Sequence, residues 1–340
     1  MDRTGLSVSA INAVGQAPGA AETRAGTVLA IDGGNSKTEI TLVDDVGRVI
    51  VRARSGAFTP QSSGVPAAVA VAAEAVADLR RQLGLAPGVP LARHLAAYVA
   101  GADLPVEEDA LLLAFAAEGW ADSAEVGNDT FAVLRAGASR PYAVAVVCGA
   151  GINCVGIGPD GRRARFPALG RITGDWGGGG YLGAEALWHA MRGEDGRGPT
   201  TALGPAIMAH FGTQTVEEVA LALHFGELAE ARLHGLSPVL MATAEAGDPV
   251  SLEVVARLAE EVVTMARVAL TRLDLTATPI EMVLGGGVLQ ARIPVLLQEI
   301  RERAAQEVPL AEIVVVTEPP VHGAALLGLD SLRKGVSSLG

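Results

Sequence analysis

The amino-acid sequence predicts an α/β protein built from two copies of one domain, each with the element order βββαβα. Short apolar runs alternate with turns between residues 28 and 54, and the same alternation begins again at residue 142. The chain has 340 residues, of which 49% are hydrophobic, so it is long enough to bury the cores of two domains of ordinary size.

The first copy opens with three apolar runs at hairpin spacing, which predict an antiparallel meander. The next segment, 67–83, has helical length and composition and is followed by Gly84 and Pro87, which favour a helix end. Acids in the first turn of a later apolar segment complement a helix dipole. The expected elements are strands at 28–31, 40–44, 49–54 and 94–103, and helices at 67–83 and 106–119.

The second copy repeats the meander around the turn Pro159-Asp160-Gly161. A long helical insertion is expected over residues 181–273, because residues 252–273 are strongly periodic. A last helix is expected at about 322–332. The expected strands are 142–147, 152–158, 162–166, 281–286 and 312–317.

Residues 28–41 read VLAIDGGNSKTEIT and predict a hairpin that grips a phosphate. Asp32 ends the first strand, where a carboxylate can hold Mg²⁺ through water. Gly33 and Gly34 allow close approach of the backbone, and Ser36, Lys37 and Thr38 offer donors to phosphate oxygens. An ordinary glycine-rich hairpin is the alternative reading of these residues.

Three further segments combine a strand or loop with glycines. Residues 142–153 run into Gly149-Ala150-Gly151, residues 170–183 carry Asp175 in a glycine-rich loop, and residues 281–287 end in three glycines. Asn128 and Asp129 precede another apolar stretch. One shared ligand explains several such segments better than a set of unrelated turns does. We expect a bulky residue in place of Gly286 to weaken ATP binding and to leave the fold intact.

The order and spacing of these motifs resemble the actin, sugar kinase and heat-shock chaperone superfamily of ATPases. Within it the chain is most similar to the N-acetylglucosamine kinase-like branch, the BadF/BadG/BcrA/BcrD ATPase family, over residues 26–330. The resemblance implies two ribonuclease H-like (actin-like ATPase) domains that face each other across a cleft. The expected organisation is a disordered leader at 1–25, an N-terminal domain at 26–127 plus about 322–334, and a C-terminal domain at 128–321.

The resemblance also implies roles for single residues. Asp129 would be the catalytic base, and Asp32 would hold Mg²⁺ through water. Sugar binding would involve Asn128, Asn153, Asp175 and Thr59. The ATP phosphates would bind at Gly33, Gly34, Asn35, Ser36, Lys37, Thr38, Gly149, Ala150 and Gly151, and adenosine at Gly285, Gly286 and Gly287.

Two positions depart from the family pattern. Trp176 follows Asp175 where family members carry glutamate, and Thr59 stands where the sugar kinases tend to place an asparagine. A pocket that bonds hydroxyls is sensitive to such changes, so they bear on the choice of sugar.

The activity implied is an ATP-dependent kinase, with ATP and Mg²⁺ as cofactors, that phosphorylates an amino sugar. N-acetylglucosamine, giving the 6-phosphate, is the first expectation. One alternative is an ATPase activator of a partner enzyme, which would need thiolates for an iron–sulfur cluster shared by two subunits. The chain has only Cys148 and Cys154. The other alternative is a non-catalytic sugar sensor, which would not need Asp129.

The composition of the chain limits the kinds of partner that it is expected to bind. The net charge is −12, and no basic cluster occurs, which argues against nucleic acid and anionic membranes as partners. No apolar stretch reaches 18 residues. Two cysteines favour a reducing, cytoplasmic setting. The expected partner is a small-molecule sugar, and the resemblance leaves a homodimer open.

Overall fold

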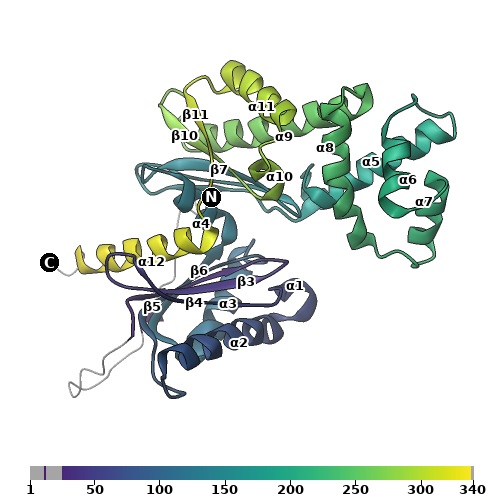
Figure 1. The fold of residues 1–340 in the computed structure, drawn as a ribbon. Coiled ribbons are helices and arrows are strands. Elements are labelled where there is room, and N and C mark those ends of the chain that lie inside the picture. Colours follow the sequence, from purple (N-terminus) through teal and green to yellow (C-terminus); the bar gives the residue numbers. More distant parts are fainter. Residues whose placement is uncertain (1–10, 13–24, 338–340) are drawn as a thin grey trace, which may run out of the picture. The chain divides into compact units, whose positions relative to one another are not determined.

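The computed structural model describes residues 11–12 and 25–337, and the chain forms two compact units (Figure 1). Unit 1 contains the residues up to Gly137 together with those from Glu318 onward, and unit 2 spans Ala138–Thr317. Most of the leader expected at 1–25 lies outside the described residues. Within it, Ile11–Asn12 form a short strand rather than disordered chain.

Unit 1 has a mixed six-stranded sheet with the order β1-β6-β5-β2-β3-β4. The strands β2, β3 and β4 form the predicted antiparallel meander, β5 runs parallel to β2, and β6 runs parallel to β5. The bounds are β1 (Ile11–Asn12), β2 (Val28–Gly33), β3 (Thr38–Val43), β4 (Val49–Ser55), β5 (Ala92–Val99) and β6 (Ala121–Asn128).

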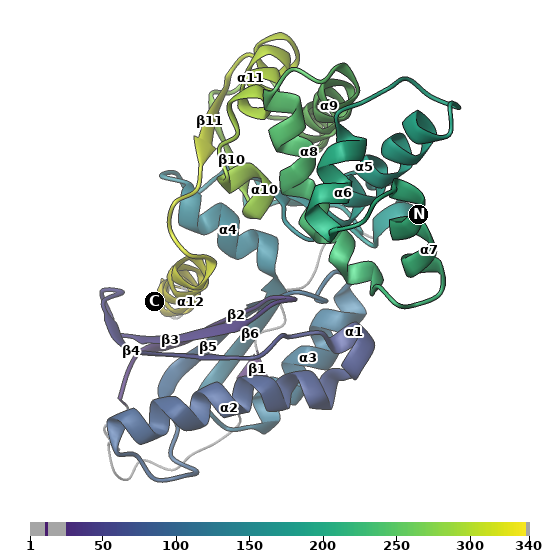
Figure 2. The ribbon, with the colours of Figure 1, turned by 45° about the vertical axis from the view of Figure 1, so that its right-hand side comes forward.

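Helices cover both faces of this sheet. Helices α2 and α3 lie on one face, and α4 and α12 lie on the other (Figure 2). Helix α2 buries a stripe that includes Ala68, Ala72 and Leu79, and it ends at Gly84, whose φ of 65° lies in the left-handed region that favours glycine. The bounds are α1 (Pro60–Ser63), α2 (Val65–Leu83), α3 (Pro105–Ala117), α4 (Asp129–Gly137) and α12 (Pro320–Ser337).

Helices α4 and α12 pack tightly on one another. A Cβ atom at Gly323 would lie 1.9 Å from the carbonyl oxygen of Ala132, so only glycine permits this approach. The guanidinium of Arg135 donates to Asp330 at 2.9 Å. Helix α4 therefore belongs to unit 1. The boundary between the two units lies at Gly137, whereas the expected boundary was at Gly127.

Unit 2 repeats the arrangement with a five-stranded sheet in the order β11-β10-β7-β8-β9. Strands β7, β8 and β9 form an antiparallel meander, β10 runs parallel to β7, and β11 runs parallel to β10. The bounds are β7 (Ala143–Cys148), β8 (Ile152–Ile157), β9 (Arg163–Arg165), β10 (Ile280–Gly285) and β11 (Ala311–Val315).

The long insertion of unit 2 is helical, as predicted. Helix α9 is its longest member and buries residues such as Val255, Leu258 and Val262 against the sheet and α11. The bounds are α5 (Gly179–Glu194), α6 (Leu203–Phe211), α7 (Val216–His224), α8 (Leu236–Glu245), α9 (Pro249–Arg272), α10 (Gly287–Gln290) and α11 (Pro294–Glu307), with 3₁₀ turns η1 (Gly170–Thr173) and η2 (Glu230–Gly235).

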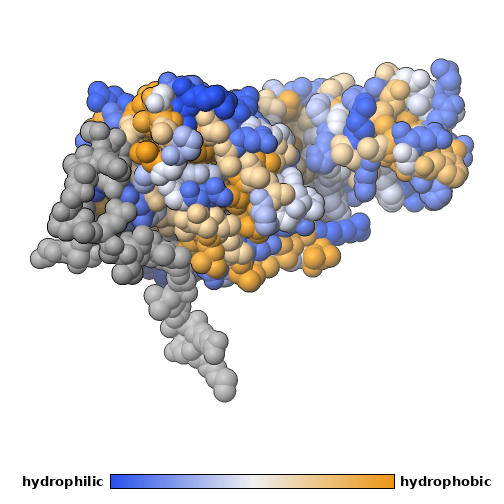
Figure 3. All heavy atoms as spheres, turned by 90° about the horizontal axis from the view of Figure 1, so that it is seen from below, coloured by the Kyte–Doolittle hydropathy of each residue, from blue (hydrophilic) through white to orange (hydrophobic). Residues whose placement is uncertain are grey.

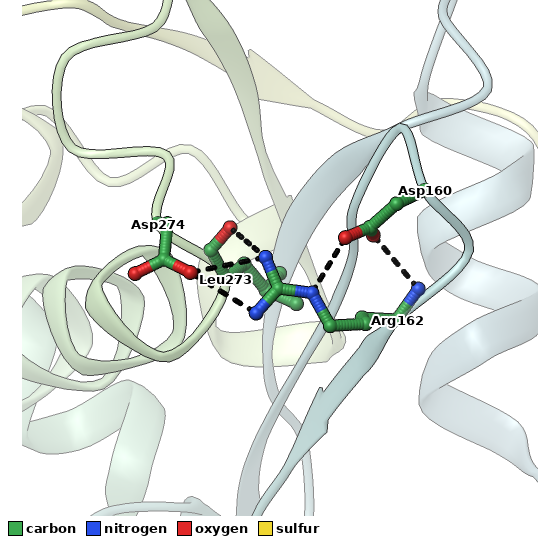
Figure 4. A network of polar contacts seen from close by, with 4 residues as sticks. All are labelled: Asp160, Arg162, Leu273 and Asp274. Carbon is green, nitrogen blue, oxygen red and sulfur yellow. Dashed lines mark hydrogen bonds and ion pairs between the residues drawn. The ribbon is translucent and has the colours of Figure 1, made fainter. Parts of the chain in front are cut away.

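The turn predicted at residues 159–161 is fastened to the end of α9 by one arginine (Figure 4). Arg162 donates to the carboxylates of Asp160 at 2.6 Å and Asp274 at 3.0 Å, and to the carbonyl oxygen of Leu273 at 3.1 Å. This network connects the β8–β9 hairpin to the helix that covers it.

No helix in the described part of the chain is both long enough and apolar enough to cross a membrane. On the face of the molecule drawn in Figure 3, hydrophilic and hydrophobic residues are intermixed.

Candidate functional site

The first predicted phosphate motif is a tight hairpin in unit 1. Strands β2 and β3 pair so that Asp32 lies opposite Glu39, and the backbone N–H of Gly34 donates to the carbonyl oxygen of Lys37 at 2.9 Å. Asn35, Ser36 and Lys37 are exposed at the tip. The tip therefore presents polar side chains to solvent at the end of a buried strand.

Two residues of this motif have structural partners. A Cβ atom at Gly33 would lie 2.8 Å from the side chains of Phe58 and Val99, so this glycine permits core packing. The buried hydroxyl of Thr38 donates to the carbonyl oxygen of Gly56 at 2.9 Å. That bond uses the hydroxyl proton that was expected to reach a phosphate oxygen.

The surroundings of Asp32 disfavour the ionised form of its carboxyl group. Burial raises its pKa to about 7, and the nearby charges of Asp129 and Glu39 act in the same direction, whereas Lys37 opposes them. Burial also raises the pKa of Asp129, against the effect of hydrogen bonds from Thr130. Unit 1 thus holds two neighbouring acids whose ionisation a cation would favour.

This donor set fits Mg²⁺, which binds through one or two carboxylates and retains several waters. No group of three or more histidine, cysteine, aspartate or glutamate side chains that could hold a metal occurs in the described residues. The residues present therefore suit a hydrated ion that also binds nucleotide phosphates, and they do not form an all-protein cage.

Asn128 connects the predicted base to a second acid. It ends β6, is 2% exposed, and its Nδ2 donates to Oδ1 of Asp103 at 2.7 Å. Its Oδ1 accepts the backbone N–H of Thr130 at 3.0 Å, which is the N-capping bond of α4. Asn128, and not Asp129, therefore makes the N-capping bond of α4.

Sequence reasoning misses Asp103, because it treats the segment 94–103 as a single strand. Strand β5 ends at Val99, and Gly101, with a φ of 75°, turns the chain toward α3. Oδ2 of Asp103 accepts from Nε2 of Gln61 at 3.0 Å. The available signal was an acid just after a glycine at the end of a buried strand.

The second phosphate motif in unit 2 lies against the glycine-rich loop. The backbone N–H of Gly149 donates to the carbonyl oxygen of Gly151 at 2.9 Å, and that of Gly179 donates to the carbonyl oxygen of Gly149 at 2.7 Å. Gly178 has a φ of 89°, and a Cβ atom there would lie 2.4 Å from the carbonyl oxygen of Ala150. Backbone meets backbone here, so glycine is required.

The third glycine segment also packs against the second phosphate motif. Gly286 has a φ of 81°, and a Cβ atom there would lie 2.5 Å from the carbonyl carbon of Cys148. The expectation that a bulky residue at 286 leaves the fold intact is therefore wrong. Gly285 is buried at the end of β10, whereas Gly287 is exposed at the start of α10, where an added Cβ atom would have no neighbour within 4 Å.

The predicted sugar-binding residues are partly engaged in local bonds. Oδ2 of Asp175 accepts from the backbone N–H of Gly170 at 2.9 Å and from the hydroxyl of Thr173 at 2.7 Å. Oδ1 of Asn153 accepts the backbone N–H of Cys154 at 2.7 Å. Thr59 lies in unit 1, before α1, and its side chain makes no capping bond.

Both cysteines are buried and free. Burial raises the pKa of Cys148 to about 12 and raises that of Cys154 as well. Thiols in this state are poor metal ligands and poor nucleophiles, because the thiolate is the reactive form.

Residues 29–328 match the model of the BadF/BadG/BcrA/BcrD ATPase family. The chain belongs to this family. It is 25% identical over 317 residues to an N-acetyl-D-glucosamine kinase of Dictyostelium discoideum, covering 90% of this chain and 98% of that protein. It is 24% identical over 300 residues to an N-acetylmuramic acid/N-acetylglucosamine kinase of Clostridium acetobutylicum, covering 88% of this chain and 97% of that protein.

Solved structures agree on the fold. A candidate N-acetylglucosamine kinase of Chromobacterium violaceum superposes with a TM-score of 0.71 at 22% identity, covering 88% of this chain and 98% of that one. A ROK family glucokinase of Streptomyces griseus in complex with glucose and AMPPNP gives 0.54 at 18% identity, covering 90% and 100%. The predicted family resemblance and the fold class of two ribonuclease H-like domains are confirmed.

Proposed function

We propose that this protein is an ATP-dependent sugar kinase that phosphorylates a hydroxyl of an amino sugar, with N-acetylglucosamine giving the 6-phosphate as the first candidate. The observation that carries the proposal is the group of neighbouring acids at the strand ends of unit 1, two of which have raised pKa values. The family is an ATPase family, and the two curated relatives are named as kinases of amino sugars.

In the proposed reaction, the oxygen of the sugar hydroxyl attacks the γ-phosphorus of ATP, and the bond from that phosphorus to the bridging oxygen breaks to release ADP. Asp129 accepts the hydroxyl proton. Its raised pKa brings its basicity closer to neutral pH, as a general base requires. Mg²⁺, held by Asp32 through water, would neutralise phosphate charge.

Asp103 is a second candidate for the base. Two neutral amides, those of Asn128 and Gln61, orient its carboxylate through hydrogen bonds at 2.7 and 3.0 Å. Neutral donors hold a carboxylate in place with less loss of basicity than a cation would cause. Matched substitutions of the two acids by asparagine distinguish them.

The remaining assignments divide between the units. In unit 1, the tip residues Asn35, Ser36 and Lys37 would donate to phosphate oxygens, and Asn128 and Thr59 would contact the sugar. In unit 2, the segment Gly149–Gly151 would bind phosphate and Gly285–Gly287 would bind adenosine. Asn153 and Asp175 would bond sugar hydroxyls.

The alternatives are less well supported. An activator ATPase that shares an iron–sulfur cluster needs accessible thiolates, whereas both cysteines are buried. A sensor that has lost catalysis would not need the acids that unit 1 retains. The protein is therefore expected to be colourless when purified anaerobically, and a brown protein would favour the activator.

The test is a coupled ADP-release assay with purified protein, ATP and Mg²⁺ over glucosamine, N-acetylglucosamine, N-acetylmuramic acid, N-acetylmannosamine and glucose. We expect ADP release that depends on an amino sugar, with phosphorylated sugar detected by mass spectrometry. ATP hydrolysis that no sugar increases would contradict the proposal.

A further inference from the structure

A polar cluster is buried on the sheet face of unit 1 that α12 covers (Figure 2). His94, Tyr98 and Glu125 are each 4% exposed. Oε1 of Glu125 accepts the hydroxyl of Tyr98 at 3.1 Å, and its Oε2 accepts the hydroxyl of Ser331, on α12, at 2.6 Å. Nε2 of His94 lies 3.7 Å from the same Oε2. Stability alone would favour apolar side chains at these positions, because a buried carboxylate loses its hydration.

Tyr98 lies between the two acids of the proposed reaction. Strands β2, β5 and β6 run parallel, and Tyr98 is paired with Asp32 on one side and with Gly127 on the other. Paired residues of parallel strands project their side chains to the same face of the sheet. Gly127 directly precedes Asn128 and Asp129, and Asp129 is the first residue of α4. The tyrosine therefore stands next to Asp32 and next to the turn that carries Asp129.

The ring of Tyr98 contacts this turn directly. A Cβ atom at Gly127 would lie 2.8 Å from Cε1 and 3.1 Å from Cδ1 of the ring. The ring therefore occupies the space that a side chain at position 127 would need, and glycine permits this contact. A shift of the ring would change the support of the backbone just before Asp129.

Glu125 fixes the ring at its hydroxyl end. A hydrogen bond from a hydroxyl to a carboxylate is stronger than one between neutral groups. Because the other oxygen of Glu125 accepts from Ser331, a chain of contacts runs from α12 through Glu125 and Tyr98 to Gly127. Helix α12 also packs directly on α4 at Gly323. Helix α4 is thus held along its length by α12 and at its start by Tyr98.

We infer that Tyr98 is a positioning residue for Asp129, and that Glu125 and Ser331 hold it in place. This inference rests on the proposed kinase function, in which Asp129 accepts the proton of the sugar hydroxyl. A general base must lie within hydrogen-bond reach of that proton, and an error of about 1 Å in position can cost about 100-fold in rate. Tyr98 acts through the backbone of the turn and not by contact with either substrate.

The first test is Tyr98→Phe, which removes the hydroxyl and keeps the ring. We expect kcat to fall about tenfold, with the KM values for ATP and sugar within about twofold of wild type, because the base is displaced and the binding groups are not. Tyr142→Phe is the matched control, since Tyr142 packs on the core of unit 2. It should leave kcat unchanged. A wild-type kcat in Tyr98→Phe would overturn the inference.

Ser331→Ala tests the connection to α12. The loss of kcat should be smaller, about threefold, because Glu125 keeps its hydrogen bond from Tyr98. An unchanged kcat in this variant would remove Ser331 from the inference.

A double substitution separates positioning from general damage. In the Asp129→Asn background there is no base to position, so the addition of Tyr98→Phe should change the residual kcat by less than about twofold. A merely structural role would lower kcat by the same factor in both backgrounds, and that result would contradict positioning.

Hydrogen exchange measured by NMR gives a readout that does not need activity. The backbone N–H of Thr130, which donates to Asn128, should exchange about fivefold faster in Tyr98→Phe, as for the loss of one hydrogen bond, and at the wild-type rate in Tyr142→Phe. Unchanged exchange in Tyr98→Phe would overturn the positioning role whatever the activity. Faster exchange in a protein without sugar-dependent ADP release would contradict the kinase function while supporting the role of Tyr98 in holding this turn.

Discussion

Units 1 and 2 have the same meander and parallel strands, but they differ in what they place at the strand ends. Unit 1 presents the acids Asp32, Asp103 and Asp129. Side-chain hydrogen bonds orient Asp103, and burial raises the pKa values of Asp32 and Asp129. Unit 2 presents glycines that bring separate backbone segments into contact, at Gly178 and Gly286. One ribonuclease H-like framework thus supports charge chemistry in one copy and close backbone packing in the other.

The comparison leads to different expectations for substitutions. In unit 1 a carboxylate can become an amide of the same shape, so catalysis should fail while the fold remains. In unit 2 any side chain at Gly178 or Gly286 collides with backbone, so the fold itself should suffer.

The largest expected effect is that of Asp129→Asn on turnover. The amide keeps the shape of the side chain but cannot accept the proton, and loss of a general base typically costs about 10²–10⁴ in rate. We expect kcat to fall at least about 100-fold with ATP affinity unchanged by calorimetry. Stability should be retained, because Asn128 makes the N-capping bond of α4.

Asp103→Asn is the matched comparison. If Asp129 is the base, Asp103→Asn should mainly raise the KM of the sugar, because it disturbs the bonds that hold Asn128 and Gln61. A larger loss of kcat in Asp103→Asn than in Asp129→Asn would transfer the role of base to Asp103.

Gly286→Val should have the next largest effect, and on stability. A φ of 81° is unfavourable for a β-branched residue, and its Cβ would collide with the backbone of Cys148. We expect a loss of roughly 3 kcal/mol or more in the free energy of unfolding, measured by urea denaturation. Gly287→Ala, at an open position, should cost little. A fully stable Gly286→Val would show that the close approach is not required.

The sequence predicted the order of elements and the glycine segments because hydrophobic periodicity and turn chemistry are local signals. Side-chain partners depend on contacts distant in sequence. The bond from Thr38 to Gly56, the pairing of Asn128 with Asp103, and the contact of Gly286 with Cys148 all join separate segments. The placement of α4 in unit 1 likewise depends on packing against α12, about which the sequence near residue 130 carries no signal.

A smaller effect is expected for Asp175→Asn. One oxygen of this carboxylate stabilises its own loop, and an amide oxygen can accept the same bonds, so stability should change little. If the carboxylate also bonds a sugar hydroxyl, the KM of the sugar should rise about tenfold, the cost of one hydrogen bond to a charged group. An unchanged KM and kcat would leave Asp175 as a loop residue only.

The smallest expected effect is a change in the pH dependence of stability at Asp32. Because its pKa rises from 3.8 to about 7 on folding, the folded protein binds a proton that the unfolded chain has released between these values. Stability from this site is therefore full below pH 3.8, falls as the pH rises through this window and stays low above pH 7. Asparagine does not ionise, so Asp32→Asn does not lose this stability as the pH rises. Its free energy of unfolding relative to wild type should therefore be at least about 1 kcal/mol greater at about pH 8 than at about pH 5.

Urea denaturation without nucleotide or Mg²⁺, at about pH 5 and about pH 8, measures this difference. Asp44→Asn is the control, because burial raises the pKa of that acid but hydrogen bonds from Arg48 and Val46 together lower it below its usual value. Asp44 is therefore ionised in both the folded and the unfolded chain at both pH values, so the stability difference between this variant and wild type should not change between them. Mg²⁺ with ATP should stabilise the wild type more than Asp32→Asn at the higher pH, since a cation compensates the carboxylate charge that the variant lacks. An equal pH dependence of stability in wild type and Asp32→Asn would show that burial does not raise the pKa of Asp32. The contrast between the two units would then depend on the glycines of unit 2 alone.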